Sequence, residues 1–328
     1  MVTVRVFLAI AAAKQWELHQ MDVHNAFLHG DLEEEVFMKL PPGLHKGQHG
    51  EACKLRKSLY GLRQATRCWS SKLSSTLKKY EFVQSYSDYS LFILQQNEVQ
   101  LNVLVYVDDL IVSGNDHEAI TQFKTYLSNC FHMKGLGNLK YFLGIEVAHA
   151  KEGIFLCQRK YALDIIFEVG LLGAKPAKIP MEQNHRLGLA QGRLFEDPEQ
   201  YRRLVGRLIY LCITRSDLAY SVHIHSQFMQ NPQIEHWEAA IRVVRYLKGS
   251  PGQGVILRNN CDLQLRGWCD TDWAGCPLTR RSLTGWLVYL GDSPISWKTK
   301  KQHIVSRFSA EAEYRSMALT TYCFTLFH

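Results

Sequence analysis

The sequence predicts an α+β protein in which antiparallel hairpins come first, a mainly helical stretch follows, and a second set of strands comes last. Residues 1 to about 150 alternate helical and strand patterns, and residues from about 160 to 250 have helical periodicity. Residues from about 262 onward open with strands. The chain of 328 residues is long enough for two or three domains with their own cores.

The first zone begins with a helix that leads into a strand. Residues 1–13 contain an apolar run and predict this helix, and Glu17–Val23 reads as a buried strand followed by a helix or turn at 24–30. Residues 101–105 and 110–112 are apolar strands around a short turn at 106–109. Residues 142–147 and 153–156 predict a further hairpin.

The middle zone has one clear helix, whose apolar residues recur at helical spacing: Trp237, Ile241, Val244 and Leu247. Glycine and proline at 249–251 predict its end. Arg242, Arg245 and Lys248 lie off this apolar stripe. They could face nucleic acid, although a solvated helix face is the more common situation for such residues.

The last zone predicts three strands and a helix. The strands are expected at 263–270, 283–289 and 295–298, and the helix at 310–324, with Ser309 as its cap. At about 100° per residue, one apolar face of this helix would consist of Ala310, Tyr314, Met317, Thr321 and Phe324. Glu313 borders that face, whereas Glu311 is expected to pair with Arg315 on the exposed side.

The composition allows a polyanionic partner without requiring one. The formal charge is +7, from 38 Lys and Arg against 31 Asp and Glu, which suits nucleic acid or an ordinary basic surface equally. No apolar run reaches the ~18 residues of a membrane span. A short apolar run at 6–13 imitates a signal peptide, but nine scattered cysteines without a Cys-x-x-Cys pair favour a reducing compartment and no zinc knuckle.

Two adjacent aspartates, Asp108 and Asp109, lie in the turn between two apolar strands. Aspartate favours turns in general, but two neighbouring carboxylates repel each other unless a cation neutralises them. Asp22 stands near the end of another apolar strand. Carboxylates from two neighbouring strands can hold two divalent ions ~3.5–4 Å apart, one for the nucleophile and one for the leaving group. The three aspartates therefore predict a two-metal site for nucleotidyl transfer.

Four segments, in this order, resemble the reverse transcriptases of copia-type retrotransposons. Residues 20–38 (QMDVHNAFLHGDLEEEVFM) are similar to the first palm motif of that family, and residues 57–65 (KSLYGLRQA) to the second. Residues 106–109 (YVDD) resemble the third, and residues 139–147 (LKYFLGIEV) resemble the primer-gripping hairpin. Thr66 and Gly135 stand where the family usually has proline and aspartate, which removes no catalytic group but suggests relaxed selection.

The resemblance implies a role for each matching residue. The ligands of the catalytic Mg²⁺ ions, with Mn²⁺ as an alternative, would be Asp22, Asp108 and Asp109. Phe27 would screen the sugar 2′ position and so favour deoxynucleotides. Tyr60 and Gly61 would line the template and the incoming base. The strand that holds the primer terminus would include Leu143, Gly144 and Ile145.

The resemblance continues to the end of the chain and implies three domains. These are a ferredoxin-like polymerase palm at 1–158, a mostly helical thumb or connection at 159–258, and the first part of an RNase H-like α/β module at 259–328. Asp270 and Glu313 would be catalytic, metal-binding carboxylates of that module, with Asp272 a weaker candidate. Further carboxylates of the family site would follow residue 328, so we expect the RNase H site of this chain to be incomplete.

The implied partners are an RNA template, a DNA primer, dNTPs, and the fingers, integrase and protease segments of a polyprotein, with no membrane. The family's fingers segment would precede residues 4–22, so we expect a chain truncated at both ends, which by itself would extend primers poorly or not at all. Cytoplasmic virus-like particles, and also the nucleus, would be its location. A catalytically inactive remnant that binds nucleic acid without sequence preference is the alternative.

The histidines of the middle zone could be metal ligands or structural residues. His223 and His225 stand two apart, as zinc ligands sometimes do, but no Cys or His partner follows at a suitable spacing. His236 matches a helix start in the family. We therefore expect all three to be structural, and no metal site from the histidines.

Overall fold

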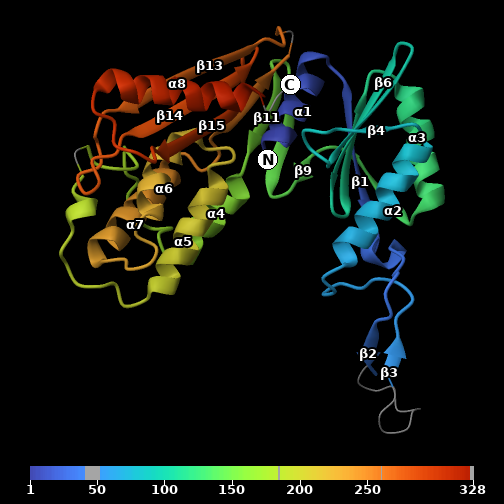
Figure 1. Cartoon of the computed structure of the whole chain (residues 1–328), viewed down its shortest axis with the longest axis horizontal. Coiled ribbons are helices and arrows are strands. Elements are labelled where there is room, and N and C mark those ends of the chain that lie inside the picture. Colours follow the sequence, from blue (N-terminus) through green and yellow to red (C-terminus); the bar gives the residue numbers. More distant parts are fainter. Residues whose placement is uncertain (41–51, 184, 260, 326–328) are drawn as a thin grey trace. The chain divides into compact units, whose positions relative to one another are not determined.

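The computed structural model describes residues 1–40, 52–183, 185–259 and 261–325, and these form two units (Figure 1). The first, called here the sheet unit, is Trp16–Leu139; the second, called the mixed unit, is Met1–Gln15 with Lys140–His328. Helices and antiparallel sheets occur in both, which confirms the predicted α+β class. The predicted boundaries near residues 158 and 258 stay predictions.

The sheet unit contains one six-stranded antiparallel sheet in the order β4-β5-β6-β7-β1-β8, and a separate β2-β3 pair. Its elements are β1 (Glu17–Val23), the 3-10 helix η1 (Ala26–His29), β2 (Phe37–Lys39), β3 (Ala52–Lys54), α2 (Ala65–Lys79), β4 (Val83–Gln84), β5 (Leu91–Gln96), β6 (Val99–Tyr106), β7 (Asp109–Gly114), α3 (His117–Cys130) and β8 (Met133–Asn138). The strand, turn and strand predicted around residues 106–109 are thus confirmed as β6 and β7.

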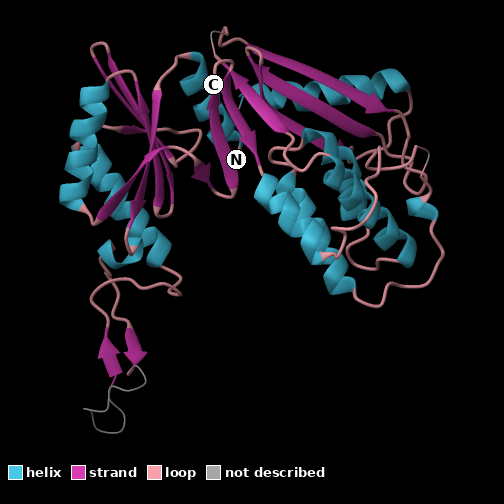
Figure 2. Ribbon diagram, turned by 180° about the vertical axis from the view of Figure 1, so that it is seen from behind, coloured by secondary structure: helices cyan, strands magenta, loops and turns pink. Residues whose placement is uncertain are grey.

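Helices α2 and α3 cover the same face of this sheet (Figures 1 and 2). Trp69 of α2 and Phe123 of α3 share one hydrophobic core with Met21 and Val23 of β1. Because successive side chains of a strand point to opposite faces, Asp22 lies on the face that α2 and α3 do not cover. The core therefore fixes the side of the sheet on which the carboxylate lies.

The mixed unit contains a four-stranded sheet in the order β12-β11-β10-β9, a three-stranded meander β13-β14-β15, and a helical core. Its elements are α1 (Val2–Ala13), β9 (Tyr141–Phe142), β10 (Ile145–Ala150), β11 (Gly153–Cys157), α4 (Arg159–Glu168), η2 (Leu187–Leu189), α5 (Pro198–Leu211), η3 (Ser216–Leu218), α6 (Ala219–Ser226), α7 (Ile234–Gly249), β12 (Gly254–Arg258), β13 (Leu265–Asp272), β14 (Leu283–Leu290), β15 (Ser293–Lys301) and α8 (Ser309–Thr325). Helices α4 to α7 share one core, and the end of α7 at Gly249 confirms the predicted stop. No helix within the described ranges combines the length and apolarity that crossing a bilayer requires.

The prediction for the buried face of α8 was wrong. Tyr314 is 72% exposed and Met317 is 53% exposed, whereas Ala312, Ser316 and Thr320 are buried against the meander. Small side chains let the helix lie close to β13. Close packing, and not hydrophobicity, therefore determines which face of α8 is buried. The helix also begins at Ser309 itself, so Ser309 is not the residue before it. The predicted pair of Glu311 with Arg315 is confirmed at 2.8 Å.

The three basic residues of α7 are partly buried, and each donates to another part of the chain. Arg242 donates to the Glu182 carboxylate at 2.8 Å, and Arg245 donates to the backbone oxygen of Lys175 at 2.9 Å. Lys248 donates to the backbone oxygens of residues 172 and 174. These side chains hold the segment 172–182 along the helix, and we call them the α7 clamp. A single-sequence pattern could not detect this, because the segment has no regular periodicity.

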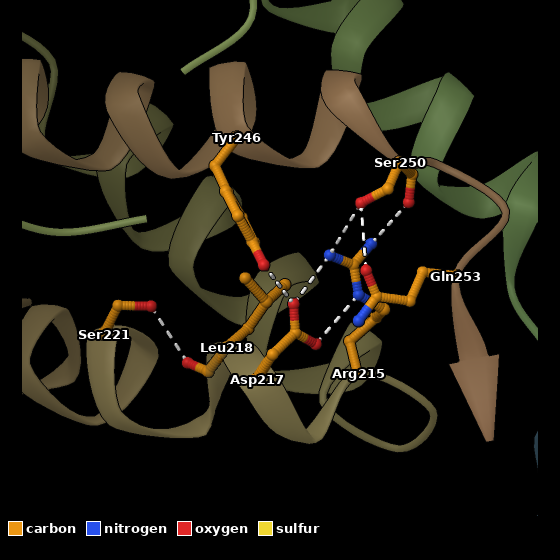
Figure 3. Close-up of polar contacts among 7 residues, drawn as sticks. All are labelled: Arg215, Asp217, Leu218, Ser221, Tyr246, Ser250 and Gln253. Carbon is orange, nitrogen blue, oxygen red and sulfur yellow. Dashed lines mark hydrogen bonds and ion pairs between the residues drawn. The ribbon is translucent and has the colours of Figure 1, made fainter. Parts of the chain in front are cut away.

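A buried ion pair at η3 is hydrogen-bonded to α7 and the residue after it (Figure 3). The Arg215 guanidinium donates to both carboxylate oxygens of Asp217, at 2.9 and 2.8 Å, and to the backbone oxygen of Ser250 at 2.8 Å. Tyr246 donates its hydroxyl to Asp217 at 3.0 Å. The Arg215 side chain is only 1% exposed, so each of these contacts compensates for lost hydration.

Candidate metal site

The register of the central strands brings the predicted carboxylates together. Strands β1 and β7 pair with Asp22 opposite Asp109, and β6 and β7 pair with Tyr106 opposite Asp109. Asp108 therefore lies in the two-residue turn that joins β6 to β7. Directly opposite residues of an antiparallel pair lie on the same face, with Cβ atoms about 4.5–5.5 Å apart. Asp22 and Asp109 are thus neighbours on the face of the sheet that α2 and α3 do not cover.

The turn that carries Asp108 has an uncommon backbone. Val107 has a φ of 56°, a left-handed conformation that a β-branched residue rarely adopts. Two hydrogen bonds hold the turn: the Trp69 indole donates to the Val107 oxygen at 2.6 Å, and the Val23 amide donates to the Asp108 oxygen at 2.9 Å. Such strain persists only where the surroundings determine the conformation. The core under α2 therefore fixes the direction of the two carboxylates.

The electrostatics of the site favour a cation. Burial raises the pKa of Asp109, and the nearby Asp108 and Asp22 raise it further, whereas the Gln20 amide, which donates at 3.2 Å, lowers it. Tyr60 donates its hydroxyl to Asp108 at 3.4 Å. Burial, followed by the charges of Asp108 and Asp22, raises the pKa of Tyr60. Three partly buried carboxylates with such mutual repulsion form a hard oxygen donor set, which suits Mg²⁺ or Mn²⁺.

The predicted nucleotide-binding residues lie beside the carboxylates. Phe27 is buried in η1, and its ring meets the Tyr60 ring edge-on at 4.3 Å. Gly61 follows with a φ of 95° and has open space where a Cβ would lie. Tyr60 is exposed and is the residue that links Phe27 to Asp108. The structure therefore brings Phe27, Tyr60 and Gly61 to the edge of the carboxylate cluster.

Gly30 fixes the approach of the segment that carries Tyr60. A Cβ on Gly30 would lie 2.8 Å from Ser58 Oγ, 2.9 Å from Cys68 Cβ and 3.0 Å from the Trp69 nitrogen. The Ser58 amide donates to the Gly30 oxygen at 3.1 Å, and its hydroxyl donates to the Phe27 oxygen. Only glycine permits this packing of η1 against the start of α2.

We expect Gly30→Ala to destabilise the chain by about 1–3 kcal/mol, since the added methyl group meets backbone and core atoms that cannot shift freely. Chemical denaturation measures the effect as a lower midpoint. Gly135→Ala is the matched control, because no atom lies within 4 Å of the Cβ position of Gly135. Equal midpoints for the two variants would contradict the close packing at Gly30.

The predicted primer-grip residues form a tight turn in the mixed unit. Leu143 and Gly144 have φ values of 48° and 74° and join β9 to β10, with Phe142 opposite Ile145. Two positive φ angles are typical of the type I′ turns that close two-residue hairpins. Tyr210 of α5 donates its hydroxyl to the Leu143 oxygen, and Ile145 is buried. The helical core of this unit therefore holds the turn in place.

The two carboxylates predicted for the RNase H-like module lie on the meander and its helix. Asp270 is exposed on β13 and accepts a hydrogen bond from the Thr271 amide at 2.8 Å, while the buried Ser316 of α8 donates to the Asp270 backbone oxygen at 3.2 Å. Glu313, also exposed, lies one turn before Ser316. Asp272 instead accepts a hydrogen bond from the Leu283 amide of β14. Asp272 therefore has a structural partner.

The structural roles predicted for the later histidines are supported by their contacts. His225 is fully buried, and burial lowers its pKa to about 4. His236 closes a capping box: its Nδ1 accepts from the Gln233 amide at 2.9 Å, and its ring stacks on Phe228 at 3.9 Å. Burial also lowers the pKa of His223.

Comparison with the sequences of known proteins places the chain in a family. The family described as Reverse transcriptase (RNA-dependent DNA polymerase) matches residues 1–183. The retrovirus-related Pol polyprotein from transposon RE2 of Arabidopsis thaliana is 44% identical over 97% of this chain. The corresponding polyprotein from transposon TNT 1-94 of Nicotiana tabacum is 36% identical over 96% of it.

The chain spans only part of those relatives, namely 22% of the RE2 polyprotein and 24% of the TNT 1-94 polyprotein. An uncharacterised mitochondrial protein of Arabidopsis thaliana is matched over most of its own length. It is 41% identical to this chain over a stretch that covers 66% of the chain and 90% of that protein. The match to the family's sequence pattern over more than half of the chain, together with these identities, shows that the chain belongs to the reverse transcriptase family of copia-type retrotransposon Pol polyproteins.

Proposed function

We propose that the chain is the RNA-directed DNA polymerase region of a copia-type polyprotein and that it transfers nucleotides with two divalent ions. The observation that carries this proposal is the pairing of Asp22 with Asp109 beside the turn that holds Asp108. These residues would hold Mg²⁺, or Mn²⁺ in its place. Bound there, the ions would lower the pKa of the primer 3′-hydroxyl and neutralise the leaving pyrophosphate.

The protein residues around the site would select and orient the nucleotide. Phe27 is positioned by its contact with Tyr60 and by the hydrogen bond between its backbone oxygen and Ser58, and its ring would exclude a 2′-hydroxyl. Tyr60 has a raised pKa and stays protonated at neutral pH, so it can donate to Asp108 and fix that carboxylate. In the mixed unit, the turn at Leu143 and Gly144 would contact the primer terminus.

Primer extension on an RNA template tests this proposal. With the family's fingers segment supplied on the same polypeptide, we expect product formation that requires a template, a primer, dNTPs and Mg²⁺ or Mn²⁺, and that stops when EDTA is added. The competing function is that of an inactive remnant that only binds nucleic acid. Binding of the RNA template and primer without any extension of the primer, at several Mg²⁺ and Mn²⁺ concentrations, would favour the inactive remnant.

For the last part of the mixed unit we propose the fold of an RNase H-like module with Asp270 and Glu313 as its carboxylates. The support is the meander β13-β14-β15 with α8 packed on β13 through Ser316. The same assay measures ribonuclease H activity if the RNA strand of the extension product is followed for cleavage. An incomplete site predicts no cleavage. Cleavage that disappears in Asp270→Asn would show that expectation to be wrong and would assign Asp270 to the site, whereas cleavage that persists in Asp270→Asn would remove Asp270 from it.

A further inference from the structure

A second group of metal-ligating side chains lies at the opposite end of β1 from Asp22. Glu17 and His19 are two residues apart on β1, so their side chains lie on the same face of the strand. His117 is the first residue of α3, whose cap Asp116 accepts a hydrogen bond from the Ala119 amide at 2.7 Å. Because Glu17 pairs with Gly114, the start of α3 lies next to the start of β1.

The Glu17 carboxylate lies between the two imidazole rings. His19 Nε2 is 2.8 Å from Glu17 Oε2, and His117 Nδ1 is 2.9 Å from the same oxygen. One ligand atom from each of the three residues lies within 4.8 Å of the others. Hydrogen bonds from both histidines lower the pKa of Glu17, so the carboxylate is anionic at neutral pH and available as a ligand.

Protons and a metal ion compete for the same atoms in this arrangement. Without a cation, the Glu17 carboxylate can accept a hydrogen bond from a ring N–H of each imidazole. One divalent ion among the three ligand atoms would take the place of these hydrogen bonds, and neutral imidazole together with carboxylate is a common zinc donor set. Side-chain exposures of 72% for His117 and 48% for Glu17 leave room for water as a fourth ligand.

We propose that Glu17, His19 and His117 form a binding site for Zn²⁺ or a similar first-row transition metal. Two imidazole nitrogens favour such ions over Mg²⁺, which prefers oxygen ligands. The site is separate from the carboxylate cluster, since Asp22 is five residues farther along β1, a distance of about 16–17 Å at ~3.3 Å per residue. A bound ion would tie the start of β1 to the start of α3.

The second ring nitrogen of His19 limits the affinity of this site. His19 Nδ1 is buried and has no hydrogen-bond partner among the described residues. Zinc-binding histidines usually donate this N–H to a carboxylate or carbonyl, and loss of that contact lowers metal affinity by about 10–100-fold. We therefore expect weaker binding than at a structural zinc site with a complete set of such contacts.

Calorimetric titration of the full chain with Zn²⁺ in excess Mg²⁺ tests the site, because Mg²⁺ keeps the oxygen ligands occupied. We expect one Zn²⁺ per chain, and a loss of at least ~10-fold in affinity for His117→Ala and for Glu17→Gln, each of which removes a ligand. Both side chains are exposed enough to be replaced without opening the core, which unchanged circular dichroism verifies. His149→Ala is the matched control, since His149 is an exposed strand histidine outside the cluster.

Cobalt absorption supplies an independent readout. Co²⁺ at this site should give visible d–d bands without the near-ultraviolet charge transfer that a thiolate ligand produces, and the bands should weaken in His117→Ala. Equal Zn²⁺ affinity of His117→Ala and the unsubstituted chain, charge-transfer absorption from cysteine, or no binding in excess Mg²⁺ would each overturn the proposal.

Discussion

Asp109→Asn is expected to abolish metal-dependent primer extension and, at the same time, to stabilise the metal-free chain. The substitution keeps the shape of the side chain but removes a ligand between Asp22 and Asp108. Metal ions at such sites supply several kcal/mol of transition-state stabilisation. At ~1.4 kcal/mol per decade, the extension rate should fall by at least about 10³-fold.

The opposite effect on stability follows from the raised pKa of Asp109. A carboxyl group whose pKa is higher in the folded than in the unfolded chain contributes stability below its unfolded pKa, near ~3.9, and this contribution is lost as the pH rises through the folded pKa. At neutral pH the charged Asp109 therefore destabilises the metal-free protein. The asparagine side chain of the variant carries no charge, so the melting temperature in EDTA should rise.

Glu98→Gln is the control for this experiment, because it removes one exposed negative charge from the same sheet unit, in the turn between β5 and β6. It should change neither the extension rate nor the melting temperature appreciably. Extension by Asp109→Asn at the rate of Glu98→Gln would contradict the site assignment. A lower melting temperature of Asp109→Asn in EDTA would contradict the account of the carboxylate repulsion.

Arg215→Met should have the largest effect on stability among the ion-pair variants. The substitution fills a similar volume but leaves the Asp217 carboxylate, which is only 24% exposed, without its bidentate partner. It also removes a hydrogen bond from the end of α7 at Ser250. Breaking a buried pair by removing one partner lowers the free energy of unfolding by about 3–5 kcal/mol. Urea denaturation followed by circular dichroism measures the change.

Arg242→Met provides the comparison for an exposed pair. Arg242 contacts Glu182 at 2.8 Å, but the two side chains are 35% and 68% exposed. Exposed pairs contribute about 0–1 kcal/mol, so this variant should unfold close to the unsubstituted chain. The double variant Arg215→Met with Asp217→Leu should recover part of the loss, since no buried charge is left unpaired. Similar denaturation midpoints for Arg215→Met and Arg242→Met would refute the role of burial.

Local sequence patterns were sufficient to predict the structure where functional side chains stand at the ends of regularly patterned apolar elements. Asp22 and the Asp108–Asp109 pair follow apolar strands, and a strand register that keeps the apolar residues in the core also brings these carboxylates to one face. The hairpin around Asp108 and the end of α7 at Gly249 could be predicted for the same reason. What the sequence did not reveal is that Trp69 and Val23 hold the strained turn.

The failures came from interactions between residues that are distant in the chain. His19 and His117 are brought together only by the pairing of β1 with β7 and by the start of α3, so no spacing rule could connect them. On α8, hydrophobicity favoured the face with Tyr314, but Ser316 reaches the backbone of β13 and that contact sets the packing. Arg215 likewise donates to Ser250 at the end of α7, which is 35 residues away.

The α7 clamp has a consequence for how the chain would respond to salt when bound to nucleic acid. Each cation that neutralises a phosphate releases condensed counterions, which contributes about 0.9 to the slope of log affinity against log salt on duplex DNA. Arg242, Arg245 and Lys248 already donate to the segment 172–182, so we expect them to release fewer counterions than unpaired cations while that segment stays in place. The number of phosphate contacts therefore cannot be read from the formal charge of +7, because some of the basic side chains already donate hydrogen bonds to the protein's own backbone.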